Sequence, residues 1–91
     1  MPERLNRVAI ALPRGDIEIP WDSREALLRE VRHMPSATGI VEAFEAVGAS
    51  QPVNLSPEQR GQLHMLIDEW SRRTSKLPEG IWSLRSALAY E

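Results

Sequence analysis

Two alternating segments joined by a turn make up "NRVAIALPRGDIEIPW", residues 6–21. Val8, Ile10 and Leu12 alternate with polar or small residues, and "DIEI" repeats this alternation, which is typical of strands with one buried face. Between the two segments, "LPRG" has proline at its second position and glycine at its fourth, as a type I turn prefers. The sequence therefore predicts a β-hairpin over residues 5–21.

The tip of this hairpin contains Arg14-Gly15-Asp16, the tripeptide that matrix proteins present to integrins. A tripeptide is a weak signal because it arises by chance. The chain also has no cysteine, and its N-terminus lacks the uncharged apolar core of a signal peptide, so an extracellular ligand is not indicated. We interpret the tripeptide as structural, with Gly15 required for the backbone angles of the turn.

A helix is predicted directly after the hairpin. Asp22 and Glu25 have the spacing of a capping box, with Asp22 as the N-cap. Pro35 should end the helix, because the residue before a proline avoids helical geometry. The apolar residues at helical spacing predict one buried stripe, made of Leu27, Leu28, Val31 and Met34.

A second helix is predicted from about residue 37 to residue 47. Ile40 and Phe44 should face the core, and Gly48 is well placed to stop the helix. The outward face should expose two carboxylates, Glu42 and Glu45.

The junction "SQPVNLSPEQ", residues 50–59, predicts a short strand followed by a long helix. Ser56 and Gln59 form a capping box, and Pro57 suits the first helical position. The helix should run to about Ser75 and bury a stripe made of Leu63, Leu66, Ile67 and Trp70. The segment "IWSLRSALAY", residues 81–90, predicts a short final helix.

These elements predict one α+β domain over residues 1–91, in the order ββααβα plus a short C-terminal helix. The sheet should be small, three-stranded and mainly antiparallel, with helices on one face and solvent on the other. The core is expected to centre on Leu27, Val31, Ile40, Phe44, Leu63, Ile67 and Trp70.

Catalytic and metal-binding signatures are missing from the sequence. His33 and His64 are the only histidines, and neither the zinc-site spacings nor the phosphate-loop and G-x-S-x-G motifs occur, so we expect no metal, no cofactor and no enzyme. His64 and Asp68 lie four residues apart on the predicted long helix, where we expect a surface pair. A general-base dyad is the alternative, but no nucleophile is evident.

The formal net charge of −2 does not favour a nucleic-acid partner, and residues 34–59 contain three glutamates and no Lys or Arg. Four cations do cluster on or near the long helix, which keeps a nucleic-acid-binding accessory protein as an alternative. We interpret those at the end of the helix as compensation of its dipole. The cluster comprises Arg60, Arg72, Arg73 and Lys76.

Two apolar residues, Met65 and Trp82, fall off the buried stripes of their predicted helices and should be exposed or in a contact.

The leading hypothesis is a cytoplasmic, non-catalytic regulator of the bacterial accessory type, an inhibitor, immunity protein or adaptor that binds a protein partner. A small non-catalytic subunit of an enzyme complex and a homodimer are alternatives. No segment has the ~20 apolar residues of a membrane span. The predicted partner-binding residues are Glu42, Glu45, Met65, Glu69 and Trp82.

Overall fold

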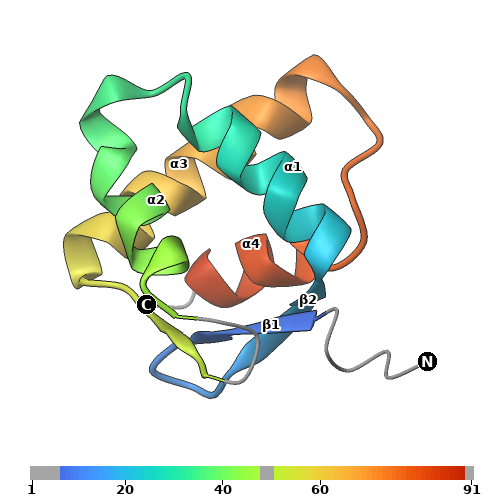
Figure 1. The fold of residues 1–91 in the computed structure, drawn as a ribbon. Coiled ribbons are helices and arrows are strands. Elements are labelled where there is room, and N and C mark those ends of the chain that lie inside the picture. The colour runs from blue at the N-terminus through green and yellow to red at the C-terminus, as the bar shows by residue number, and fades with distance from the viewer. Residues whose placement is uncertain (1–6, 48–50, 90–91) are drawn as a thin grey trace.

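A three-stranded sheet lies at one end of the molecule and supports four α-helices in the computed structural model, which describes residues 7–47 and 51–89 (Figure 1). Strands β1 (Arg7–Ala11) and β2 (Ile17–Pro20) form the predicted antiparallel hairpin. Strand β3 (Val53–Asn54) pairs with the other side of β1 and runs parallel to it, which gives the order β2-β1-β3. The sheet is therefore mixed.

The hairpin turn has the predicted form. The Gly15 backbone N–H donates to the Leu12 carbonyl oxygen over 3.0 Å, which closes the turn that "LPRG" predicted. Gly15 has a φ of +135°, a conformation that side chains with a Cβ atom rarely adopt. The structural interpretation of Arg14-Gly15-Asp16 as a turn is confirmed, and all three residues are exposed.

The strands and helices of the described chain follow in the predicted order, ββααβαα. A short 3₁₀ turn, η2 (Pro35–Ala37), leads into α2. The four α-helices are α1 (Trp21–Val31), α2 (Thr38–Glu45), α3 (Pro57–Arg73) and α4 (Ile81–Ala89).

The N-terminus of α1 differs from the prediction. The helix begins at Trp21, immediately after β2, and its N-cap is Pro20, which is extended and makes no side-chain capping bond. The predicted capping box of Asp22 and Glu25 is therefore wrong. Because β2 passes into the helix without a loop, Asp22 already lies within the first turn, where its charge still favours the helix dipole.

The C-terminus of α1 also lies earlier than predicted. The helix ends at Val31. Two hydrogen bonds between residues three apart follow, from His33 N to Glu30 O over 3.1 Å and from Met34 N to Val31 O over 2.8 Å, as in a 3₁₀ turn. Met34 is consequently not part of the buried stripe of α1. It lies in the half-buried connection before Pro35.

The predicted start of α3 is confirmed. Gln59 N donates to Ser56 Oγ over 3.1 Å, and Ser56 N donates to Gln59 Oε1 over 2.9 Å, so both bonds of the capping box are present. The helix ends at Arg73, slightly before the predicted Ser75, because Thr74 is extended. On α2, Glu42 and Glu45 are exposed as predicted, whereas the predicted stop at Gly48 lies outside the described residues.

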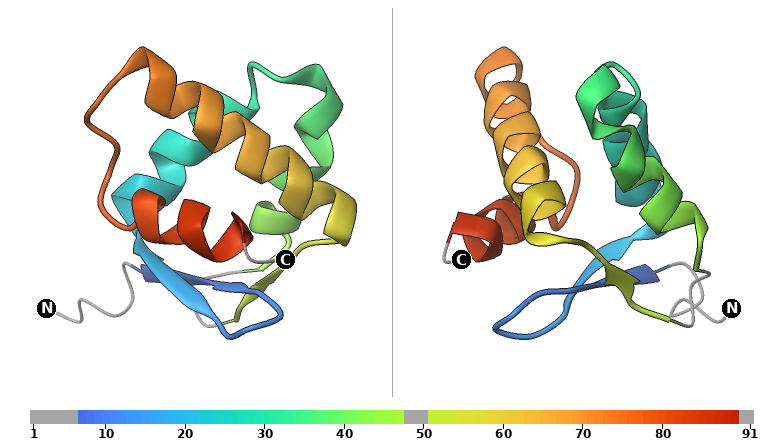
Figure 2. Two further views of the ribbon diagram at one scale, coloured as in Figure 1. Left: turned by 180° about the vertical axis from the view of Figure 1, so that it is seen from behind. Right: turned by 90° about the vertical axis from the view of Figure 1, so that its left-hand side faces the viewer.

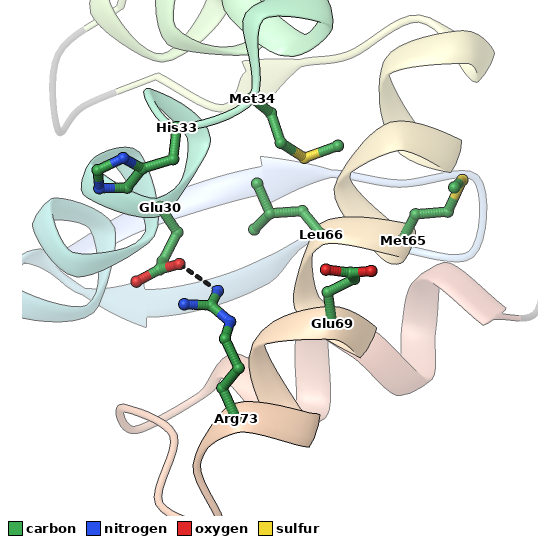
Figure 3. A pocket seen from close by; sticks show the side chains of 7 residues that line it. All are labelled: Glu30, His33, Met34, Met65, Leu66, Glu69 and Arg73. Carbon is green, nitrogen blue, oxygen red and sulfur yellow. Dashed lines mark hydrogen bonds and ion pairs between the residues drawn. The ribbon is translucent and has the colours of Figure 1, made fainter.

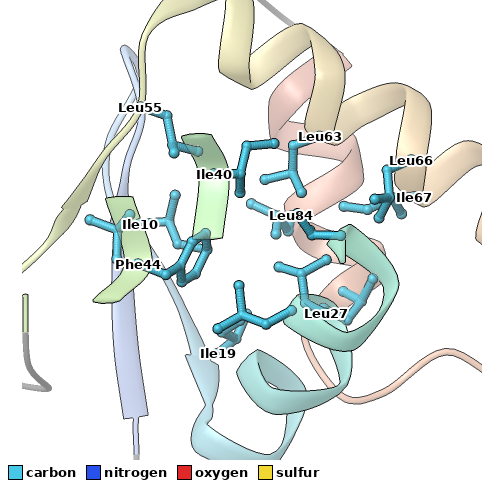
Figure 4. Close-up of a cluster of buried hydrophobic side chains, with 14 of the residues drawn as sticks. Ile10, Ile19, Leu27, Ile40, Phe44, Leu55, Leu63, Leu66, Ile67 and Leu84 are labelled. Atoms are coloured by element: carbon cyan, nitrogen blue, oxygen red, sulfur yellow. The ribbon is translucent and has the colours of Figure 1, made fainter. Parts of the chain in front are cut away.

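The helices cover one face of the sheet, as predicted, and leave the other open (Figure 2). The core between sheet and helices draws side chains from both layers (Figure 4). On the open face, Arg7 and Glu18 are exposed and Ala9 is half-buried. All seven predicted core residues are buried: Leu27, Val31, Ile40, Phe44, Leu63, Ile67 and Trp70.

Candidate binding groove between α1 and α3

A cavity of about 370 Å³ opens between the C-terminal end of α1 and the adjoining face of α3 (Figure 3). We call it the α1–α3 groove. Its two walls come from segments more than thirty residues apart in the chain, so it exists only in the folded molecule. The groove is lined by Glu30, His33, Met34, Met65, Leu66, Glu69 and Arg73.

The apolar part of the groove consists of Met34, Leu66 and Met65 (Figure 3). Leu66 is only 3% exposed and belongs to the core, so it forms the apolar floor of the groove. Met65 is 64% exposed and Met34 is half-buried. Because methionine is unbranched and polarizable, these two side chains can adapt their shape to a bound group.

The polar part of the groove has an excess of negative charge. Arg73 Nη2 lies 2.6 Å from Glu30 Oε1, and this ion pair joins α3 to α1 (Figure 3). Glu69 is exposed and makes no hydrogen bond or ion pair with the described part of the chain. The groove therefore contains two carboxylates, one guanidinium group and the imidazole of His33. The carboxylate of Glu69 remains open to an external cation.

Of the predicted partner-binding residues, the structure brings Met65 and Glu69 together in this groove. Glu42 and Glu45 lie on α2 outside it, and Arg32 Nη2 is 3.3 Å from Glu45 Oε2. Trp82 is 47% exposed on α4, also outside the groove. The five residues therefore do not form one continuous site.

Sequence reasoning missed the α1 wall of the groove. The helical periodicity predicts a buried stripe that includes Met34, and no local pattern connects Glu30 or His33 with a binding site. The contact between Glu30 and Arg73 spans 43 residues of sequence, and no local pattern predicts such a contact. The unusual spacing of Met65 relative to its stripe was the one feature that pointed to the groove.

The side of α3 that faces α4 carries a network of ion pairs. Arg85 Nη2 lies 2.6 Å from Asp68 Oδ1, and Arg72 Nη2 lies 2.9 Å from Asp68 Oδ2. The hydrogen bond from Arg85 lowers the pKa of Asp68 below its ordinary value of 3.8; partial burial opposes this shift, and the charge of Arg72 adds to it. His64 acts on Asp68 only through a weaker electrostatic effect. With both carboxylate oxygens bonded to arginines, the arrangement does not resemble a general-base dyad.

The basic cluster is largely engaged within the protein. Arg72 pairs with Asp68, Arg73 pairs with Glu30, and Arg60 Nη1 donates to the Leu55 carbonyl oxygen over 2.9 Å. These contacts orient the guanidinium groups toward other protein atoms. Phosphate binding would compete with these contacts only in part, because the side chains of Arg72 and Arg73 are 72% and 61% exposed.

The three tryptophans have separate surroundings. Trp70 is buried in the core, and Trp21 is half-buried with the Arg24 guanidinium 4.1 Å from its ring centroid. Arg24 is itself buried, and its Nη1 lies 2.6 Å from Glu25 Oε2. Trp82 is exposed, with the Arg85 guanidinium 5.9 Å from its ring centroid. Trp21 and Trp70 are thus explained by packing, whereas Trp82 is not.

Within residues 7–47 and 51–89, no three His, Asp or Glu side chains are placed to hold a metal ion. No helix in the same ranges has both the length and the apolar character needed to cross a membrane. Compared with known proteins, the chain matches no family model, and neither a curated protein nor a solved structure is significantly similar to it. A function has to be inferred from the groove itself.

Proposed function

We propose that this protein is a non-catalytic interaction module that binds a protein partner through the α1–α3 groove. The observation that supports this most directly is the exposed Met65 beside an apolar floor and an open carboxylate, that of Glu69. Apolar surface rimmed by polar groups is typical of protein contacts. A groove of about 370 Å³ is the size of a pocket for one or two anchoring side chains, around which a larger contact would form.

The nucleic-acid alternative has less support. Phosphate binding depends on available cations, and three of the four cations in the basic cluster already contact protein atoms. The net charge of −2 adds a general repulsion toward a polyanion. A protein partner requires neither an active site nor a basic surface.

We also propose that the protein is an inhibitor, an immunity protein or an adaptor. An inhibitor, immunity protein or adaptor acts by contact alone, and any of these roles fits a small module with one adaptable groove. The absence of cysteine fits a reducing compartment, so we propose a cytoplasmic location.

Partner capture with matched surface variants tests the proposal. Met65 and Trp82 are the large apolar residues exposed in the described part of the chain, and only Met65 lines the groove. Met65→Glu should abolish capture of a partner identified by mass spectrometry, while Trp82→Glu should retain it. Because both side chains are exposed, neither variant should unfold the protein. The opposite pattern would assign the contact to α4.

Duplex binding at two salt concentrations tests the nucleic-acid alternative. We expect no binding at micromolar protein, with or without the charge reversal of Arg72 and Arg73 to Glu. The reversal of Glu42 and Glu45 to Lys serves as the matched variant of opposite sign. Binding with a steep salt dependence that only the arginine variant loses would favour nucleic acid over a protein partner.

A further inference from the structure

We infer that the α1–α3 groove binds a cationic side chain with an apolar stem, that is, a lysine or arginine of the partner protein. This inference rests on the proposed function and adds the chemistry of the partner to it.

The charge of the groove is the first reason. Glu30 and Arg73 largely neutralise each other, because their side chains are 2.6 Å apart. Glu69 lines the same groove and has no counter-ion among the described residues. The remaining charge is therefore negative, and a cation is the complementary group.

The apolar part is the second reason. Lysine and arginine pack their methylene stems along apolar surface and keep the charged end at a polar rim. In the groove, Met34 and Leu66 provide such a surface, and the exposed Met65 lies at the α3 edge of the groove (Figure 3). A stem packed there could place its charge beside Glu69.

Other side chains fit less well. A purely apolar side chain would exclude water from Glu69 without providing a hydrogen bond or charge in exchange, which is unfavourable. A carboxylate would have Arg73 as its counter-ion, but Arg73 is already paired with Glu30, and Glu69 would repel it. A cation with an apolar stem satisfies both parts of the groove.

Three probes of six carbons each separate charge from apolar contact: hexylammonium, hexanol and hexanoate. Methyl NMR of the Met34 and Met65 side chains, assigned with Met34→Leu and Met65→Leu, reports on the groove directly. From the concentration dependence of these methyl shifts, we expect the affinity to be highest for hexylammonium, lower for hexanol and lowest for hexanoate. Glu69→Gln should reduce the preference for hexylammonium over hexanol by about two- to fivefold, the range of an exposed ion pair.

Glu42→Gln is the matched control, since it removes one carboxylate from the same protein at an exposed position outside the groove. It should leave the preference unchanged. Equal losses in both variants would mean that net charge, not Glu69, determines the preference, and would overturn the inference.

The remaining outcomes separate this inference from the proposed function. If all three probes shift the methionine signals equally, or hexanoate binds most tightly, the cationic partner is wrong while the groove remains an apolar binding site. If no probe shifts them, both the inference and the proposed function fail. Shifts that appear on concentrating the protein alone would show that a second copy fills the groove, and would also overturn the inference.

Discussion

Asp68 and Glu69 are adjacent residues on α3 with opposite surroundings. Asp68 faces α4 and receives both Arg72 and Arg85, whereas Glu69 faces the groove toward α1 and has no partner in the described chain. One helix thus has two charged flanks. We call them the α4 flank, with Asp68, Arg72, Trp82 and Arg85, and the α1 flank, which is the α1–α3 groove.

The difference shows that charged side chains on one flank of a helix can stabilise the fold while those on another flank can bind a partner. On the α4 flank Arg72 and Arg85 both contact the carboxylate of Asp68, so an external cation would have to displace an existing pair to reach that carboxylate. On the α1 flank the Glu69 carboxylate lies beside exposed apolar surface. We therefore assign stability to the first flank and propose binding for the second.

The largest expected loss of stability comes from truncating a core residue of α3, the helix that carries both flanks. Trp70 is 8% exposed, on the buried side of α3. Trp70→Ala should lower the free energy of unfolding by about 3–5 kcal/mol, because it leaves a cavity in the core. Chemical denaturation measures this loss. Trp82→Ala is the control and should cost far less, since Trp82 is exposed; equal losses would contradict the different surroundings of the two residues.

Gly80 positions the start of α4 and hence the α4 flank. Its φ is +85°, and an added Cβ atom would lie 2.9 Å from Ile19 Cγ2 in the core. Gly80→Ala should destabilise the fold by about 1–3 kcal/mol through backbone strain and this contact.

Gly15→Ala is the matched control for that substitution. Gly15 also has a positive φ, +135°, but an added Cβ atom would meet nothing within 4 Å. It should therefore cost less than Gly80→Ala in the same thermal or chemical denaturation. A larger loss for Gly15→Ala would mean that the contact with Ile19 is unimportant.

Neutralising the two adjacent carboxylates tests the comparison between the flanks most directly. Asp68→Asn removes the negative partner of Arg72 and Arg85, so it should lower the melting temperature. Glu69→Gln changes the net charge equally but breaks no ion pair, so stability should stay within about 0.5 kcal/mol of the parent. Equal destabilisation by both variants would show that the two flanks do not differ in this way.

The smallest effect concerns pH. Arg85 and Arg72 hold the pKa of Asp68 in the folded protein below its ordinary value of 3.8, so folding favours the ionised form. The stability that Asp68 contributes is complete above this ordinary pKa and is lost as the pH falls through the lower, folded pKa. The stability difference between the parent and Asp68→Asn should therefore shrink below about pH 4. A difference that stays constant down to the folded pKa would contradict the shift.

Local sequence signals predicted most of the fold. The turn at "LPRG", the capping box of Ser56 and Gln59, and the buried stripe of α3 each depend on residues within a few positions of one another. The predicted box at Asp22 was wrong because the preceding strand continues directly into α1. Even a good local pattern can thus be overruled by the element before it.

Short-range sequence patterns predicted the elements, their order, the core residues and the exposure of Met65, because periodicity and capping act over short distances. The tertiary structure alone shows that β3 runs parallel to β1 and that Glu30 and Met34 lie beside α3. It also decided which of two adjacent carboxylates is neutralised. Asp68 and Glu69 point about 100° apart around the helix, and the charges on each neighbouring helix, which come from distant sequence, determine what each carboxylate meets.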